Sequence, residues 1–213
     1  MAVMGMNCAS GSKALFTGSD LSGWIQDPGH AGHWVAKEGL IDYDGKSTAK
    51  DPCLWTEAEF GDFELEVDWR FPRAPVEMER PVFGPDGKET GQKVKVRDAG
   101  DSGIYLRGNS RSQVNIWCWP CGSGEVWGYR TDSKMPDDVR AAVTPKENAD
   151  RPPGEWNRFV ITMKGDRLTV VLNDRTVIEN ARLPGVAPKG RIALQHHGDP
   201  VQFRNLRIRE LAP

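Results

Sequence analysis

Aromatic, amide and guanidinium side chains gather between residues 101 and 130, in the segment DSGIYLRGNSRSQVNIWCWPCGSGEVWGYR. Aromatic rings stack on the C–H faces of sugars, and amide or guanidinium groups hydrogen-bond hydroxyls, so this combination is typical of a carbohydrate site. The side chains that we assign to sugar binding are Tyr105, Gln113, Asn115, Trp117, Trp127 and Tyr129, together with Gln195 near the C-terminus. For each aromatic residue, core packing is the alternative, because that is the commoner fate of tryptophan.

Two histidines and an arginine are the first candidates for chemistry. His196 and His197 end the segment IALQHH, and histidine titrates near neutral pH. Because adjacent strand residues point to opposite faces, we expect at most one of them to enter the site. Arg107 ends SGIYLR, where it would share a face with Tyr105 and bind hydroxyls or polarise a carbonyl. The alternative for the two histidines is a place at the rim of the site, where they bond to loops. The alternative for Arg107 is a structural salt bridge.

Alternating patterns indicate the strands that must position these groups. Val114 and Ile116 would share one face of a strand, which we expect to be core, while Gln113, Asn115 and Trp117 share the other. The clearest strand is 63–71, FELEVDWRF, in which apolar and polar residues alternate strictly. Further strands are predicted over 33–41, 53–55, 156–163, 168–172, 191–195 and 201–208.

Two segments have the composition of long connections. Residues 73–101 are rich in Pro, Gly and charge, which predicts a lid or a small subdomain, with a short strand at 94–96 and a surface insertion as the alternative. Residues 131–153 have a similar composition. No long amphipathic helix is evident. Short strands and long connections favour an all-β fold, in which two antiparallel sheets form a jelly-roll sandwich.

Length and charge limit the classes of protein that this chain can represent. The 213 residues suit one sandwich domain over 14–213, with a flexible segment at 1–13 and an inserted loop at about 72–101. A net charge of −2 and scattered basic residues argue against nucleic acid as a partner, and no apolar run is long enough to cross a membrane. Oligomeric state stays open, a homo-oligomer included. The N-terminus shows no secretory signal.

The segment Cys118-Trp119-Pro120-Cys121 is a C-x-x-C motif. A zinc site would need a second such pair, so a local disulfide or two buried thiols explains the motif better. Asp98, Asp101 and Asp199 would be the oxygen ligands of a Ca²⁺ ion, but they form no recognisable ligand loop. The motifs therefore predict no cofactor and no specific metal site, and Ca²⁺ stays open as an alternative.

Several motifs, in order along the chain, resemble the 3-keto-disaccharide hydrolase domain: LFTGSDLSGW (15–24), FELEVDWR (63–70), SGIYLR (102–107), GEWNRFVI (154–161) and IALQHHGDPVQFRNLRIREL (192–211). The resemblance implies the fold of concanavalin A-like lectins and glucanases, and a periplasmic or extracellular location. It also implies cleavage of a glycoside that is already oxidised at carbon 3. A ketone there acidifies the C2 proton, so a base, an enolate stabiliser and an acid would suffice.

The chain departs from this family in two places. An insertion over 71–101 separates two strands that usually follow one another, and Gln113 and Cys118 stand where many relatives resemble E-V-Q-I-x-D. Loss of both acids makes a non-catalytic carbohydrate-binding module the main alternative. A conventional glycosidase is the second, and it would require Glu64 and Glu125 to converge in the cleft. Either carboxylate would also be an alternative base.

Overall fold

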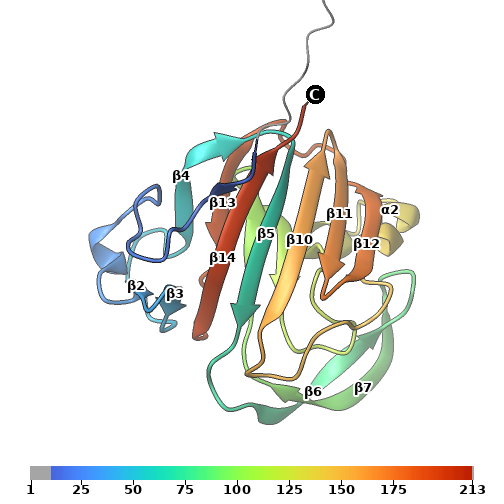
Figure 1. Cartoon of the computed structure of the whole chain (residues 1–213). Helices are drawn as coiled ribbons and strands as arrows, with labels where there is room; N and C mark the ends of the chain where they lie inside the picture. Colours follow the sequence, from blue (N-terminus) through green and yellow to red (C-terminus); the bar gives the residue numbers. More distant parts are fainter. Residues whose placement is uncertain (1–10, 213) are drawn as a thin grey trace, which may run out of the picture.

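The computed structural model describes residues 11–212 and consists mainly of two antiparallel β-sheets packed face to face (Figure 1). The larger sheet has eight strands, with β1 (Lys13–Ala14) paired to β14 beside the main order. That order is β12 (Arg175–Arg182), β11 (Arg167–Leu172), β10 (Asn157–Lys164), β5 (Phe63–Arg70), β14 (Val201–Glu210), β3 (Leu40–Tyr43) and β2 (Trp34–Lys37).

The smaller sheet lies behind the larger one in Figure 1. Its order is β4 (Leu54–Phe60), β13 (Gly190–Leu194), β8 (Ser102–Leu106) and β9 (Asn109–Ile116). A separate ribbon is formed by β6 (Val76–Phe83) and β7 (Glu89–Asp98). The described helices are short: η1 (Pro28–His30), α1 (Trp127–Arg130) and α2 (Asp137–Ala142).

The apolar side chains of the alternating strands fill the space between the two sheets. On β5, Phe63, Leu65, Val67 and Trp69 are at most 2% exposed and pack into one core that also takes Ile104, Val114 and Ile116 from the smaller sheet. Burial of these large apolar side chains is the main favourable contribution to folding, at roughly 1.5–3 kcal/mol each. The predicted antiparallel jelly-roll sandwich and the inward side of β9 are confirmed.

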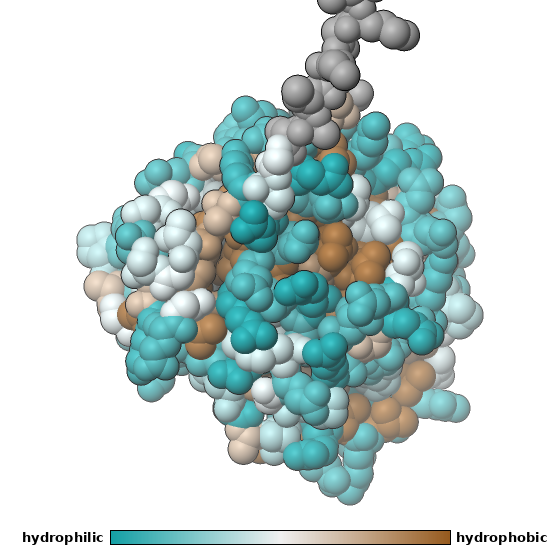
Figure 2. Space-filling view, viewed as in Figure 1, coloured by the Kyte–Doolittle hydropathy of each residue, from teal (hydrophilic) through white to brown (hydrophobic). Residues whose placement is uncertain are grey.

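The outer face of the larger sheet is mostly hydrophilic, around a small apolar area near its middle (Figure 2). Glu64 lies on this face, paired with Arg209 of β14 at 3.0 Å, because the alternate residues of β5 fill the core. No helix within the described residues is long and apolar enough to cross a bilayer.

The structure corrects the prediction for three segments. Residues 73–101 form the β6–β7 ribbon rather than a loop, and the predicted strand at 94–96 is part of β7. Residues 131–153 contain the helix α2. Strand β12 has no counterpart among the predicted strands. Most of the predicted flexible segment, and Cys8 with it, lies outside the described residues, whereas Lys13 is part of β1.

Candidate active site

A cleft of about 500 Å³ lies on the outer face of the smaller sheet. Strand pairing aligns Ala193, Tyr105 and Gln113 in one row across β13, β8 and β9. The next row holds Gln195, whose N–H donates to the carbonyl of Gly103, and Asn115, which pairs with Gly103. Tyr105, Gln113, Asn115 and Gln195 all line the cleft, as the alternation of the sequence predicts.

Glycine at position 103 is what lets the amides meet. A Cβ atom there would lie 2.4 Å from Gln113 Nε2, so any larger residue would push the Gln113 side chain off β8. In the space that Gly103 leaves, Gln113 Nε2 donates to Gln195 Oε1 at 2.8 Å and also to Asn115 Oδ1. Two strands that are not neighbours are thereby joined through one side chain.

This hydrogen-bond chain continues below the floor of the cleft. Asn115 Nδ2 donates to Glu125 Oε2 at 3.3 Å, and Glu125 forms an ion pair with Arg130. Burial raises the pKa of Glu125 to about 7, against the opposite effect of Arg130 and Asn115. A connected network of this kind fixes side-chain rotamers, so the amides of the floor are held in place before any ligand arrives.

Trp117 and Trp119 line one wall of the cleft and belong to a stack of three rings. Trp117 lies 4.2 Å from Trp119 between ring centroids, at an interplanar angle of 5°, and Phe83 of β6 stacks on Trp119 at 6.0 Å. Trp127 of α1 meets Trp117 edge-on and is 44% exposed. Trp117 is only 2% exposed, so it supports Trp119 and Trp127, which offer the larger accessible surfaces to a ligand.

Asp101 and His197 both line the cleft, and the charge of His197 acts on the carboxyl group of Asp101. Burial raises the pKa of Asp101 to about 6, with the nearby carboxylates of Asp98 and Asp199 acting in the same direction and His197 opposing them. A carboxyl group that titrates near neutrality beside a histidine is suited to moving protons. Within the described chain, Asp101 is the single carboxylate that lines this cleft.

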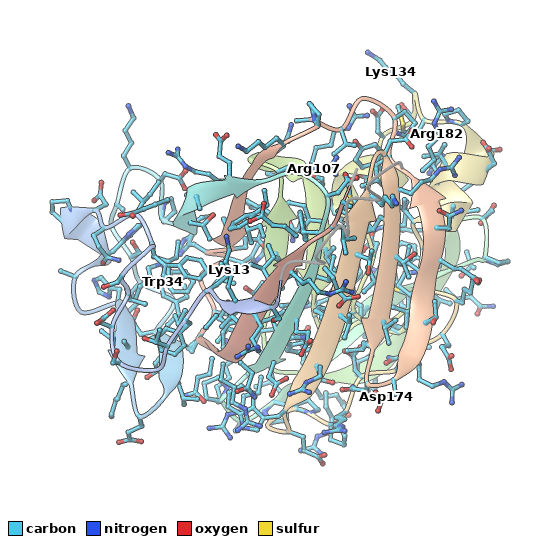
Figure 3. All side chains as sticks on the ribbon, turned by 45° about the horizontal axis from the view of Figure 1, so that its top comes forward. Lys13, Trp34, Arg107, Lys134, Asp174 and Arg182 are labelled. Atoms are coloured by element: carbon cyan, nitrogen blue, oxygen red, sulfur yellow. The ribbon has the colours of Figure 1, made fainter. Side chains whose placement is uncertain are left out.

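The structure places Arg107 outside the cleft, contrary to the prediction. Its φ of 51° turns the chain after β8, so Arg107 does not continue the alternation of Tyr105. Its guanidinium is buried at one end of the sandwich (Figure 3), where it pairs with Asp62 at 2.9 Å and donates to the carbonyls of Gly61, Gly165 and Ala187. These contacts make it a structural residue that ties three loops together.

The two carboxylates predicted as alternative bases, Glu64 and Glu125, also lie outside the cleft. Glu64 lies on the outer face of the larger sheet, on the far side of the core from the cleft. Glu125 is fully buried and paired with Arg130, so it contacts no ligand and instead orients Asn115. The paired-carboxylate arrangement of a conventional glycosidase is therefore not formed by these two residues.

Two further predicted residues point away from the cleft. The ring of His196 hydrogen-bonds the hydroxyl of Tyr43 through Nδ1, and burial lowers its pKa. His197 alone lines the cleft, in agreement with the expectation that at most one of the pair does so. Tyr129 is 1% exposed, and its hydroxyl donates to the carbonyl of Pro184, so it belongs to the core.

The cysteines of the C-x-x-C motif are free thiols. Burial raises the pKa of Cys118 to about 11 and that of Cys121 to about 12, so neither is a ready nucleophile or metal ligand. In residues 11–212, no three His, Cys, Asp or Glu side chains gather as a metal site would require. Asp98 and Asp199 are ion-paired with Arg80 and Arg73 instead.

A family model described as the 3-keto-alpha-glucoside-1,2-lyase-like domain matches residues 11–209, nearly all of the chain. The chain belongs to this family. The family resemblance that the sequence motifs indicate is thus confirmed, and membership of the 3-keto-alpha-glucoside-1,2-lyase-like family places the protein among carbohydrate-active domains. No match was found among curated proteins.

Solved structures share the fold of this 3-keto-alpha-glucoside-1,2-lyase-like domain. Two putative glycosyl hydrolases from Parabacteroides distasonis match with TM-scores of 0.61 and 0.62 at 24% and 19% identity. The matches cover 94% and 95% of this chain and 84% and 95% of theirs. The carbohydrate-binding module CBM66 from Bacillus subtilis matches with a TM-score of 0.51 at 16% identity, over 88% of this chain and 96% of its own. At these identities the likeness establishes a common fold.

Five residues that line the cleft of this family member were not among the predicted site residues: Asp101, Ser110, Arg111, Trp119 and Gly128. Asp101 could have been predicted from the sequence. It precedes β8 by one residue and lies two and four positions before Gly103 and Tyr105, so it should face the same side of the sheet. Trp119 lies two residues after Trp117 and should share its face, but it stands within the C-x-x-C motif, which was interpreted through its two thiols alone.

Proposed function

We propose that the protein cleaves 3-keto glycosides by removing the C2 proton, eliminating the group on C1 and adding water to the product. The observation that carries this proposal is Asp101, a carboxyl group with a pKa near 6 that shares the cleft with His197 and with no second carboxylate among the described lining residues. Elimination next to a ketone needs one base and one acid, whereas ordinary glycoside hydrolysis needs two carboxyl groups.

The proposed cycle returns every proton. Asp101 takes the C2 proton, and the electron pair forms an enolate with the C3 ketone. The enolate then expels the glycosidic oxygen from C1, and a C1–C2 double bond remains. Protonated His197 gives its proton to the departing oxygen. Water adds to C1 as His197 takes its proton, and Asp101 returns the first proton to C2. Both residues end in their starting states.

Tyr105 and Gln195 are the proposed stabilisers of the enolate oxygen. Burial raises the pKa of Tyr105, which keeps its hydroxyl protonated and able to donate. The Gln195 carbonyl oxygen accepts from Gln113, so its amide nitrogen is the end that remains for Tyr105 or a ligand. Donors that are fixed in advance lower the free energy of a developing oxyanion without a cost in reorganisation.

The test compares a 3-keto disaccharide with its parent disaccharide as substrates of the purified protein. We expect turnover of the oxidised sugar only, and a fall in kcat of about 100-fold or more in D101N and in H197Q. H196Q and R107K serve as matched controls, since neither side chain reaches the cleft, and both should keep kcat close to that of the unaltered protein. Preference for the parent disaccharide would contradict the proposal.

Carbohydrate binding without catalysis is the second candidate function. It is favoured by the fold shared with the module CBM66 and by the exposed ring of Trp127 beside the cleft. In that case the protein would bind the 3-keto disaccharide without releasing product, and D101N would bind as tightly as the unaltered protein.

A further inference from the structure

A second hollow lies behind the tryptophan stack. Trp117 and Trp119 line both the cleft and this hollow, so the two spaces are separated by these rings. The second space has a volume of about 300 Å³, and its apolar walls include Trp69, Phe71 and Pro152. Apolar walls with a few polar groups are the usual make-up of a small-molecule site.

Two buried polar atoms on residues that line this hollow have no hydrogen-bond partner, Trp69 Nε1 and Asp150 Oδ1. The ring of Trp69 is 2% exposed and packs against Phe71 and Phe159, so its N–H is cut off from bulk solvent. The other carboxylate oxygen of Asp150 accepts from the N–H of Ser123 at 2.8 Å. Buried polar groups in folded proteins are almost always paired, so these two atoms call for a partner.

The chemistry of the two atoms specifies that partner. The indole N–H needs an acceptor and the carboxylate oxygen needs a donor, and a hydroxyl group is both. Burial raises the pKa of Asp150 to about 6, as expected of a carboxylate whose second oxygen lacks a donor. The charged residues that line the hollow are balanced, with Asp150 and Glu155 against Arg97 and Arg151, which favours a neutral ligand over an ion.

We propose that this hollow is a second sugar-binding site, which holds one neutral monosaccharide by hydroxyl contacts to Trp69 Nε1 and Asp150 Oδ1. Its volume stands at the lower end of the range of roughly 300–1,000 Å³ for small-molecule sites, which suits a single ring. The site is independent of Asp101 and His197, so it stands even where the proposed chemistry of the cleft fails.

The test is a titration of the ¹⁵N-labelled full chain with D-glucose, followed on the indole N–H signals of the tryptophans. W69F assigns the Trp69 signal by removing it. We expect that signal to shift in a saturable manner, and the dissociation constant to rise about tenfold in D150N, which turns an acceptor into a donor at the hollow. Y105F is the matched control in the cleft, and it should leave the Trp69 titration unchanged.

The opposite results are equally distinct. A Trp69 signal that does not move while Trp117 or Trp127 does would put the sugar in the cleft alone and overturn the proposal. A Trp69 shift that Y105F abolishes and D150N leaves intact would do the same. A glucose-soaked crystal of the unaltered protein answers without any substitution: a sugar ring between Trp69 and Asp150 supports the site, and a water molecule there refutes it.

Discussion

At Asp101, burial outweighs the nearby positive charge. The buried position and the carboxylates of Asp98 and Asp199 hold its pKa near 6, while His197 works against them. A base with this pKa is ionised at neutral pH and still basic enough to accept a proton. The same residue therefore sets the pH dependence that we expect for the reaction.

Replacing His197 with Gln should move that pH dependence. For the unaltered protein we expect kcat/KM to fall as the pH drops through about 6, because the Asp101 base becomes protonated. H197Q removes the positive charge that lowers the pKa of Asp101, so in the remaining activity this acidic limb should move to higher pH. A pH profile of kcat/KM from 4.5 to 8 measures it, and a limb that stays in place would contradict the role of Asp101.

Arg107 shows how one backbone angle redirects a side chain. In R107A, three loop carbonyls and Asp62 lose their donor, which should destabilise the fold by about 2–4 kcal/mol. Because no contact reaches the cleft, kcat of the folded fraction should change less than twofold. Urea unfolding and turnover at low temperature separate the two effects. A large loss of kcat at unchanged stability would return Arg107 to the active site.

The sequence pattern predicted which side chains line the cleft where those side chains follow regular strands. Tyr105, Gln113, Asn115 and Gln195 lie within strands or directly after one, and alternation places them correctly. The predicted position of Arg107 was wrong because its own left-handed backbone and a register shift after Tyr105 break the alternation. For Glu64, alternation gave the right face of the strand, but no local pattern tells which of two sheets the strand will join.

Among the elements, the β6–β7 ribbon belongs to neither main sheet and supports the cleft from behind, through the stacking of Phe83 on Trp119. Its base is held by the ion pair of Arg80 with Asp98 at 2.6 Å, and its far end by Lys88 and Asp137 at 3.0 Å. Phe83 completes the ring stack between these points. Its strands are exposed on both faces for most of their length, so they lack the alternation that identified β5.

Substitution of Gly87 should release the end of the ribbon. Gly87 has a φ of 74°, and a Cβ atom there would lie 2.7 Å from Thr144 Oγ1 and 2.9 Å from the Arg140 carbonyl. We expect G87A to cost about 1–2 kcal/mol of local stability. Hydrogen exchange should then rise across β6 and β7, and KM should increase more than kcat falls, since the ring stack binds but does not react. G91A, also at positive φ but with no atom within 4 Å, is the matched control.

For the whole molecule, three buried carboxyl groups affect stability in the same direction. The folded-state pKa values of Asp101, Glu125 and Asp150 are raised to about 6, 7 and 6. The folded protein therefore holds protons that the unfolded chain has already released, so the free energy of unfolding should fall as the pH rises from about 4.5 to 7. Below that range, protonation of Asp68, whose pKa is lowered by Arg158 and Asn205, reverses the trend.

The variant D150N isolates one part of this effect. An amide has no charge to bury, so D150N should be more stable than the unaltered protein at pH 7, by about 1–3 kcal/mol, and equal to it near pH 4. Urea unfolding at pH 4, 5, 6 and 7 provides the measurement. A stability difference that does not vary with pH would mean that Asp150 is ionised at no cost.

Fold class was predictable for the whole molecule because it depends on many strands at once. Alternation at 63–71, 156–163 and 201–208 identified the centre of the larger sheet, and these segments are β5, β10 and β14. Strand β12 was not predicted because its sequence RTVIENAR does not alternate. Two consecutive residues, Val177 and Ile178, are both buried at a register shift. Irregular edges follow local geometry that no periodic pattern encodes.

The close stack of Trp117 on Trp119 also gives the protein its own optical probe. Two indoles 4.2 Å apart between ring centroids are close enough to couple their electronic transitions, so we expect a paired signal in circular dichroism that an isolated tryptophan lacks. Phe83, from a segment more than thirty residues earlier, holds Trp119 against its partner. During refolding, recovery of this couplet would therefore date the docking of the ribbon separately from the return of the sheets.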